Sequence, residues 1–367
     1  MSPINKKKVL IISMRAGFGH LRAGSALLDY AKINLKNLNV EHVDILDVDP
    51  FLKPLTRFYE ATAIKVPFVW GAIYKLSNFR ITTYFIKYLG YFNFAFKYKI
   101  RNYIKTKNPD VILITNIICM PIFLSACKKI INDKKIAVLI TDYHGHHYYK
   151  FSRVDYYFVP HGQVKDDLEK MGVKSEKIIV TGIPISPKFY VKHDIKELKL
   201  KYKIDNNYPT VLFISSFRIS GASLISIVKR ILKSQFKVNL IFIANGNKKF
   251  YDLVKNIQNN RFLSVNWTNE IEEYMKVSDV VISKAGGLTV SECIALKKPM
   301  IIVNPISGQE EHNAEFMEKN NFGKKVKKID EIIEILPKII LENQNKNNQK
   351  QDTDLPKNPS QKIFNYI

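Results

Sequence analysis

The sequence predicts an α/β protein with two doubly wound parallel sheets, each in a domain of its own. Short apolar runs rich in β-branched residues recur along the chain, and each is followed by a loop and a stretch with helical periodicity. Near-continuous apolar strands are typical of parallel sheets, because helices cover both faces of such a sheet. With 367 residues the chain has about twice the length of a typical domain, so we expect two of these sheets.

The apolar runs fall into two series, separated by a stretch that starts with Gly-Ile-Pro at residue 182. In the first series, strands are expected at residues 9–13, 40–46, 111–115, 136–140, 156–159 and 178–180. In the second, strands are expected at residues 211–215, 238–243, 262–265, 280–283 and 300–303. We therefore expect an N-terminal domain over residues 1–182 and a C-terminal domain over residues 183–341. Residues 342–367 are rich in Asn, Gln and Lys, which favours a disordered tail.

The charge balance narrows the range of partners. Lys and Arg outnumber Asp and Glu by 57 to 33, which gives a formal net charge of +24. This excess favours a nucleic acid, an anionic membrane surface or a phosphorylated ligand. The 3 cysteines are too few for a disulfide framework or a zinc site and fit a reducing, cytoplasmic setting. We expect neither a secretory signal nor a spanning helix, since basic residues interrupt the longest apolar stretch, residues 81–104.

Residues 51–107 form a basic and aromatic insert in the N-terminal domain. The segment contains eleven basic residues, sixteen aromatic residues and a single acid, Glu60. Amphipathic helices of this composition are typical of the headgroup boundary of an anionic bilayer, where each Lys or Arg contributes about 1 kcal/mol. We therefore expect a peripheral membrane surface; the alternative is that the aromatic side chains pack in the core beneath a solvated basic face. Nucleic acid is not an expected partner, because no RNA- or DNA-binding module is recognisable.

The loop after the first expected strand is the first candidate for chemistry. It contains Gly17 and Gly19, which would let the backbone approach a ligand closely, and His20 at the start of the next helix. A dinucleotide fingerprint is not complete, since Arg22 stands where its third glycine would be. The alternative interpretation is a tight turn with a histidine at a helix start.

The strongest pattern follows the two expected strands at residues 280–283 and 300–303. After the first strand, two glycines open a helix whose free amide groups would hold a diphosphate, together with a threonine hydroxyl. A glutamate further along that helix would accept hydrogen bonds from ribose, and a Gln-Glu pair after the second strand would bind sugar hydroxyls. Turns and helix caps alone explain the glycines but not these polar residues. The residues are Gly286, Gly287, Thr289, Glu292, Gln309 and Glu310.

This pattern resembles the donor-binding signature of glycosyltransferase family 28. The family includes monogalactosyl- and processive diacylglycerol glycosyltransferases and the peptidoglycan N-acetylglucosaminyltransferase. The resemblance extends over about residues 8–330, and the diacylglycerol branch is the more similar one because of Thr141-Asp142-Tyr143, His146 and Gly308-Gln309-Glu310. It implies a GT-B fold, with two Rossmann-like domains facing across a cleft. It also implies a nucleotide-sugar donor, usually linked to UDP, in the C-terminal domain and a lipid acceptor at the N-terminal domain.

The resemblance also assigns roles to residues. Trp267 and Thr268 would border the base of the donor, and His20 would approach the acceptor hydroxyl. His146 would belong to the loop on the acceptor side. One departure is the sequence Ser-Ser-Phe-Arg at residues 215–218, where the family has a glycine-rich loop; Arg218 would then compensate electrostatically for part of the lost phosphate binding.

The implied reaction is an inverting displacement that needs no metal ion and no cofactor beyond the UDP-sugar co-substrate. Either His20 or Asp142 would deprotonate or orient the acceptor hydroxyl. We expect no metal at Asp47-Val48-Asp49, which lies in the other half of the chain from the donor residues, or at His144, His146 and His147. The expected location is the cytoplasmic face of the membrane. Three alternatives stay open: a peptidoglycan-type N-acetylglucosaminyltransferase, a UDP-sugar 2-epimerase, and a non-catalytic basic membrane-binding protein.

Overall fold

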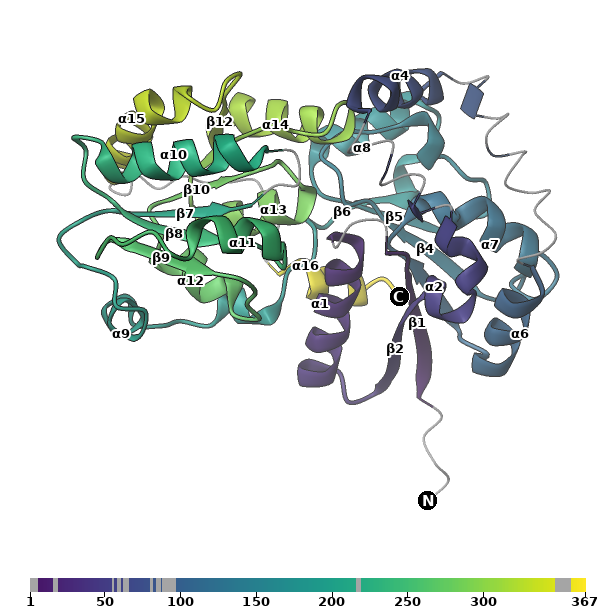
Figure 1. The fold of residues 1–367 in the computed structure, drawn as a ribbon. Coiled ribbons are helices and arrows are strands. Elements are labelled where there is room, and N and C mark those ends of the chain that lie inside the picture. Colours follow the sequence, from purple (N-terminus) through teal and green to yellow (C-terminus); the bar gives the residue numbers. More distant parts are fainter. Residues whose placement is uncertain are drawn as a thin grey trace. The chain divides into compact units, whose positions relative to one another are not determined.

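The computed structural model divides the chain into two compact units. The first unit comprises Met1–Pro187, Ser307–Gln309 and Asp354–Ile367, and the second comprises Lys188–Ile306 and Glu310–Thr353. Each unit contains one six-stranded sheet (Figure 1). The division after Pro187 lies a few residues beyond the expected boundary at residue 182. The structure describes residues 6–15, 19–54, 56–57, 61, 66–79, 82–83, 87, 97–215, 219–346 and 358–367.

The sheet of the first unit is parallel throughout, with the strand order β2-β1-β3-β4-β5-β6. Its strands are β1 (Lys7–Ser13), β2 (Leu38–Asp44), β3 (Val111–Ile114), β4 (Lys135–Leu139), β5 (Tyr156–Val159) and β6 (Ile178–Val180). All four residues of β3 are buried, as expected for a central strand covered on both faces. The expectation that the second strand extends to residue 46 is wrong: the Asp44 side chain accepts a hydrogen bond from the Leu46 amide and caps a short helix there.

Helices lie on both faces of the first sheet (Figure 1). They are α1 (Gly19–Asn34), α2 (Ile45–Val48), α4 (Pro67–Ser77), α6 (Lys97–Lys107), α7 (Met120–Cys127) and α8 (Gly162–Lys170), with short 3-10 turns that include η4 (His147–Tyr149). In α7 the side chains from Met120 to Leu124 are buried, so this helix forms part of the core against the sheet.

The expectation of a disordered tail over residues 342–367 is wrong at both ends: residues 342–346 continue helix α15 (Glu331–Lys346), and the last residues form a further helix. Helix α16 (Pro359–Phe364) is capped by Asn358, and it packs against α1 in the first unit. Phe364 stacks on Tyr30 of α1 at a ring distance of 6.1 Å, and Tyr366 contacts Tyr156 of β5. These apolar side chains follow the polar stretch, and burying them offsets the entropy lost on ordering the segment. Residues 347–357 lie outside the described residues.

The second unit repeats the doubly wound plan, with the parallel strand order β12-β11-β10-β7-β8-β9. Its strands are β7 (Thr210–Ile214), β8 (Asn239–Ile243), β9 (Phe262–Val265), β10 (Val280–Ser283), β11 (Met300–Ile302) and β12 (Gly323–Lys325). Its helices are α9 (Ile195–Lys201), α10 (Gly221–Lys233), α11 (Lys248–Val254), α12 (Ile271–Val277), α13 (Gly287–Ala295), α14 (Gln309–Lys319) and α15 (Glu331–Lys346). The first residue of α14, Gln309, is assigned to the first unit. In each unit the carboxyl ends of the strands meet at one edge of the sheet, where loops are placed to form a site.

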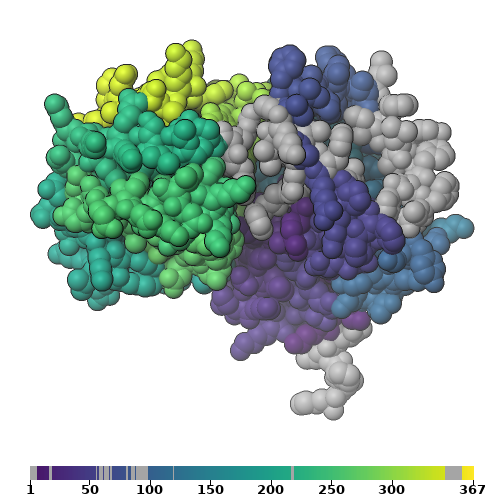
Figure 2. Space-filling view, viewed as in Figure 1, coloured from purple at the N-terminus to yellow at the C-terminus, as the bar shows by residue number. Residues whose placement is uncertain are grey.

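Helix α4 has two different faces. Gly71, Tyr74 and Ser77 face the rest of the first unit, and a methyl group on Gly308 would collide with the Tyr74 ring. The outer face carries exposed apolar side chains, among them Phe68, which is 88% exposed, and Leu76, which is 57% exposed. Figure 2 shows α4 on the molecular surface, at the top of the view. No helix in the described part of the chain is long and apolar enough to cross a membrane.

Candidate active site

A hydrogen-bonded network lies at the carboxyl ends of β1, β3 and β4 in the first unit, which we call the first edge. The Ser13 hydroxyl, at the end of β1, lies 2.8 Å from the Thr115 hydroxyl, which follows β3. The Thr115 hydroxyl also donates to the main-chain oxygen of His20, at 3.1 Å. The Ser13 hydroxyl lies 2.8 Å from His42 Nε2 on β2 as well. Neighbouring strands thus fix the first turn of α1, which carries His20.

His20 is held with a defined proton arrangement. Its Nδ1 lies 2.9 Å from the Thr115 carbonyl oxygen and 2.9 Å from the Thr141 hydroxyl. Because a carbonyl oxygen only accepts hydrogen bonds, Nδ1 carries the proton, and Nε2 of the neutral ring is then unprotonated. Burial lowers the pKa of His20, against the opposing effects of the Asp142 charge and the Thr115 carbonyl. The ring is therefore neutral near pH 7 and able to accept a proton at Nε2.

Asp142 follows β4, is 6% exposed, and has hydrogen-bond donors on both carboxylate oxygens. The Gln309 side-chain nitrogen lies 2.8 Å from each oxygen, and the Tyr149 hydroxyl donates to Oδ2 at 3.1 Å. Gln309 belongs to the first unit with Ser307 and Gly308, and Gly308 has a left-handed φ of 84°, which glycine adopts without strain. The carboxylate of Asp142 is therefore held in place by two side chains, and its charge favours the protonated form of the His20 ring.

His146 lies in the loop between Asp142 and Tyr149, and both of its ring nitrogens have hydrogen-bond partners. Its Nδ1 accepts a hydrogen bond from the Tyr148 amide at 3.0 Å, so Nε2 carries the proton and lies 3.3 Å from the Ser77 hydroxyl. The ring is 3% exposed and packs on Tyr74, and burial lowers the pKa of His146 to about 4. His146 therefore ties the loop that carries Asp142 to the inner face of α4.

In the second unit, the start of α13 lies directly after β10. Gly286 is the N-cap residue and, as a glycine, provides no side-chain cap to the first amides of α13. A methyl group on Gly286 would find its nearest neighbour 4.0 Å away, so packing does not require glycine at this position. Asn313 donates to the Ala285 carbonyl at 3.0 Å and holds the loop before the helix in place. Glu292 lies within α13 and is 1% exposed.

Two further loops border the same edge of the second sheet, which we call the second edge. Trp267, after β9, is 52% exposed, and a methyl group on Gly246 would lie 3.5 Å from its ring. Gly246 has a φ of 81° and follows β8, so the loop ends of two neighbouring strands meet at the indole. The Thr268 hydroxyl accepts a hydrogen bond from the Glu270 amide and shapes the turn after Trp267.

Glu310 is bound to the protein itself. Its Oε1 lies 2.5 Å from Lys284 Nζ, and its Oε2 accepts a hydrogen bond from the Ile306 amide at 2.9 Å. Sequence reasoning did not assign a role to Lys284, nor to Ser13 or Thr115 in holding His20. A lysine or a hydroxyl after a strand carries no pattern of its own. Strand order brings Ser13 and Thr115 together, and Lys284 meets Glu310 through a contact between residues 26 positions apart.

The expected donor residues Gly286, Gly287, Thr289 and Glu292 thus share one helix, while Gln309 lies on Asp142 and Glu310 on Lys284. Gly17 and Arg218 lie outside the described residues. At Gly19, a methyl group would find no described atom within 4 Å, so packing does not require glycine there. Among the described residues no group of His, Cys, Asp and Glu side chains could hold a metal ion.

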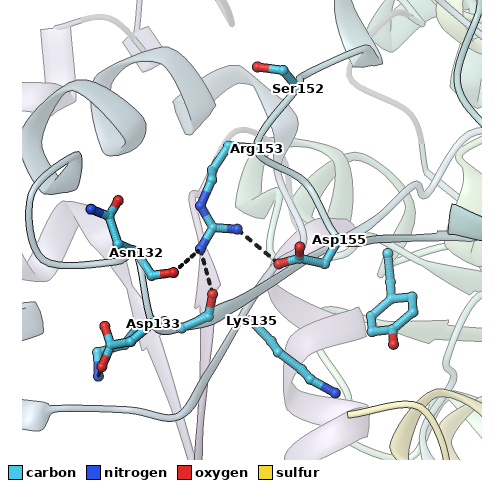
Figure 3. Close-up of a pocket in the computed structure, with 8 residues that line it drawn as sticks. Asn132, Asp133, Lys135, Ser152, Arg153 and Asp155 are labelled. Carbon is cyan, nitrogen blue, oxygen red and sulfur yellow. Dashed lines mark hydrogen bonds and ion pairs between the residues drawn. The ribbon is translucent and has the colours of Figure 1, made fainter.

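A pocket of about 380 Å³ lies away from these residues, between the turn before β4 and the turn before β5 (Figure 3). In it the Arg153 guanidinium donates to Asp155 at 3.0 Å and to the main-chain oxygen of Lys134 at 2.6 Å. These contacts join two turns at the amino ends of the strands, the opposite end of the sheet from His20. We therefore assign the residues of this pocket a structural role, which is to join these two turns.

Comparisons with known proteins give a matching family model for each half of the chain. Residues 20–185 match the family model for monogalactosyldiacylglycerol (MGDG) synthase, and residues 220–365 match that for the glycosyltransferase family 28 C-terminal domain. A processive diacylglycerol beta-glucosyltransferase of Staphylococcus saprophyticus is 27% identical over 87% of this chain and 81% of its own. The protein of the same name from Staphylococcus carnosus is 28% identical over 91% of this chain and 84% of its own.

Solved structures share the two-sheet architecture. The S. aureus MnaA–UDP co-structure matches with a TM-score of 0.63 at 14% identity, over 98% of this chain and 96% of that one. Acinetobacter baumannii MurG matches with a TM-score of 0.55 at 13% identity, over 98% and 99% of the two chains. At these identities the likeness concerns the fold, and it confirms the expected GT-B class.

Proposed function

We propose that this chain, which belongs to glycosyltransferase family 28, transfers a hexose from a UDP-sugar to a diacylglycerol-type lipid at a membrane surface. The chain is a hexosyltransferase, and the finer assignments of donor, acceptor and mechanism make up the proposal. The observation that carries it is the start of α13, where an uncapped first turn follows β10 and the buried Glu292 lies in the same helix. Such a turn suits a diphosphate, because its amides point outward and the helix dipole favours negative charge.

The donor is assigned to the second edge. The α13 amides and Thr289 bind the diphosphate, Glu292 accepts hydrogen bonds from the ribose, and the exposed Trp267 with Thr268 borders the base. A nucleoside diphosphate fits this set, because its three parts follow one another in the same order: the diphosphate at the amides, the ribose at the carboxylate and the base at the aromatic ring. Because both relatives are named beta-glucosyltransferases, glucose is the first hexose to test.

The reaction is a single displacement at the anomeric carbon of the sugar. Nε2 of neutral His20 takes the proton of the acceptor hydroxyl, and the hydroxyl oxygen forms its bond to the anomeric carbon. The bond between that carbon and the diphosphate oxygen breaks, UDP leaves with the bonding electron pair, and the configuration is inverted. General base catalysis of this kind typically contributes about 10²–10⁴-fold. Asp142 stabilises the imidazolium that forms, because its charge favours the protonated ring.

The charge that develops on the leaving diphosphate is stabilised by the α13 amides, in the manner of preorganised donors at other sites of charge development. We therefore propose a reaction that needs no divalent ion. The acceptor reaches the first edge from a membrane on which the outer face of α4 rests. Its exposed Phe68 and Leu76, with the exposed Lys75, match the mixture of apolar and basic side chains that binds anionic bilayers.

The test is a transfer assay with the full chain. Vesicles of phosphatidylglycerol and diacylglycerol are incubated with radiolabelled UDP-glucose, UDP-galactose or UDP-N-acetylglucosamine, with and without EDTA. We expect label in the lipid phase, with the same rate in EDTA. A polyprenyl-diphosphate sugar and a sample without acceptor are tested in parallel. Label only on the polyprenyl acceptor would indicate the peptidoglycan-type reaction, free sugar without acceptor would indicate epimerisation or hydrolysis, and no turnover with any donor would contradict the proposal.

A further inference from the structure

Lys284 and Glu310 form an ion pair next to the proposed diphosphate site. Lys284 follows the last residue of β10, and its Nζ lies 2.5 Å from Glu310 Oε1. The two side chains differ in exposure: Lys284 is 38% exposed and Glu310 is 6% exposed. The second carboxylate oxygen, Oε2, accepts the Ile306 amide at 2.9 Å. The carboxylate of Glu310 is thus buried and bound through both oxygens, whereas the Lys284 side chain is partly exposed.

The position of this carboxylate relative to α13 is equally informative. Glu310 Oε1 is the nearest atom to the place where a side chain on Gly286 would begin, at 4.0 Å. Gly286 is the N-cap residue of α13 and provides no capping group of its own. An anionic oxygen therefore lies beside the positive end of α13 and on a lysine. This is the environment that a phosphate oxygen of the donor would seek.

Glu310 cannot serve two partners at once. The sequence predicts that it binds hydroxyls of the sugar, but in the structure both of its oxygens are bound, one to Lys284 and one to the Ile306 amide. The donor brings two phosphate groups next to Lys284, and a diphosphate offers this cation more negative charge than a single carboxylate does. Exchanging one anion for the other would release the Glu310 carboxylate.

We propose that Lys284 is a diphosphate-binding residue and that the Glu310 carboxylate occupies its place until the donor binds. This inference rests on the proposed function, because it takes the donor to be a nucleoside diphosphate sugar. Lys284 then supplies the counter-charge for the leaving group, and the displaced Glu310 carboxylate turns to the sugar. The exchange breaks one ion pair, forms another, and needs no further reactant.

A purely structural ion pair makes the opposite prediction for one variant. If Glu310 only holds its loop, Glu310→Gln leaves the affinity for UDP unchanged or lowers it, because the loop is less well placed. If Glu310 competes with the diphosphate for Lys284, the same variant raises the affinity for UDP, because glutamine is neutral and gives up Lys284 more easily. The sign of the change therefore separates the two roles.

The experiment is a calorimetric titration of the full chain with UDP and with inorganic pyrophosphate. We expect UDP to bind Glu310→Gln about 3–10-fold more tightly than the wild type, and Lys284→Met about 10-fold or more weakly, as for the loss of a hydrogen bond to a charged group. In the double variant Lys284→Met/Glu310→Gln the gain should vanish, since the cation for which the two anions compete is absent. Glu318→Gln is the matched control, because Glu318 pairs with Lys324 elsewhere in the same unit, at 3.4 Å, and should bind UDP like the wild type.

Equal or weaker UDP binding by Glu310→Gln, in a protein that melts like the wild type, would overturn the inference. Should Glu310→Gln not fold, Glu310→Asp replaces it; the shorter side chain loses reach to Lys284, and tighter UDP binding is again the expected result. A wild type that binds neither UDP nor pyrophosphate and transfers no sugar would remove the proposed function itself. If the wild type binds UDP but the Glu310→Gln variant does not bind it more tightly, the inference alone is overturned.

Discussion

The two sheet edges have the same scaffold but different chemistry. Each lies at the carboxyl ends of the strands of a six-stranded parallel sheet, and in each the loops after the central strands carry the polar residues of the candidate site. The first edge contains ionisable side chains in a fixed hydrogen-bond network, His20 and Asp142 above all. The second edge contains main-chain amides at the start of α13, a buried glutamate in that helix, and the Lys284–Glu310 ion pair.

This difference teaches that the fold places a site, whereas the loops decide what the site does. A network that fixes the tautomer of a histidine is suited to moving a proton. A row of amides with a nearby cation is suited to binding an anion. Changes at the first edge should therefore act on turnover, and changes at the second edge on donor affinity.

The largest effect is expected for His20→Asn. The asparagine amide can still donate to the Thr115 carbonyl, but the variant has no group in place of Nε2. We expect kcat to fall by about 10²–10⁴-fold, while the affinity for UDP measured by calorimetry stays as in the wild type. A folded variant with nearly wild-type kcat would show that the first edge does not supply the base.

The second edge should respond in the opposite way. Glu292→Gln keeps the size of a buried side chain but removes the charge that we propose accepts hydrogen bonds from the ribose. Such bonds contribute about 1.5–3 kcal/mol, so the KM for the UDP-sugar should rise by about 10–100-fold with a smaller change in kcat. Glu318→Gln, on the same unit, is the control. A fall in kcat alone would erase the distinction between the edges.

A smaller effect is expected for Tyr149→Phe. The variant removes the hydroxyl that donates to Asp142 Oδ2 at 3.1 Å and leaves the aromatic packing intact. This bond acts on His20 only indirectly, through the Asp142 carboxylate, and Gln309 still donates to that carboxylate in the variant, so kcat should fall by only about 2–10-fold, with UDP affinity unchanged. The neighbouring Tyr148→Phe, whose hydroxyl contacts the Ile118 carbonyl at 3.4 Å, should leave kcat as it is. Equal losses in the two variants would argue against a role for Tyr149 at Asp142.

The activity should also depend on pH through His20. Because burial lowers the pKa of His20, its neutral form persists below pH 6.5, and kcat/KM should fall only on the acid side of that value. Removing the opposing charge in Asp142→Asn should move this acid limb to still lower pH. A limb that moves to higher pH would contradict the proposed interaction, and the measurement is the pH profile of kcat/KM for the two proteins.

The smallest effect on activity, and the clearest one on stability, concerns His146. The pKa of His146 is lowered to about 4 in the folded protein and is 6.5 in the unfolded chain, so the unfolded chain binds more protons between these values. The contribution of this difference to the free energy of unfolding is complete above pH 6.5 and is lost as the pH falls toward 4. The total loss is on the order of 3 kcal/mol. His146→Asn can retain the cap on Tyr148 without titrating. Its melting temperature should therefore fall less between pH 7 and pH 5 than that of the wild type, and parallel curves would refute this origin.

Sequence reasoning captured the strands because burial on both faces leaves a local signature. β5, β6, β9 and β10 have the predicted bounds, since each is a short apolar run with a sharp polar boundary. β12 was missed because Gly323–Lys325 is a polar edge strand with only one neighbour. Helix α16 was missed because a polar segment precedes it and its partner, α1, lies at the other end of the chain.

The site was predictable only where its parts are close in sequence. Gly286, Gly287 and Glu292 share one helix, so their grouping follows from spacing alone. The contact between His20 and Thr115 joins residues 95 positions apart, and that between Gln309 and Asp142 joins residues 167 apart. Such contacts depend on strand order and on how a loop folds back, which no local pattern encodes.

The most direct test of the account is a crystal structure of the full chain with UDP. The account predicts the diphosphate at the first amides of α13, within about 3.5 Å of Gly287 N and Lys284 Nζ, with the ribose at Glu292 and the Glu310 carboxylate moved off Lys284. His20 should keep its contact with Thr115 in that complex. Nucleotide density away from α13, or a diphosphate bound while Glu310 still holds Lys284, would contradict it.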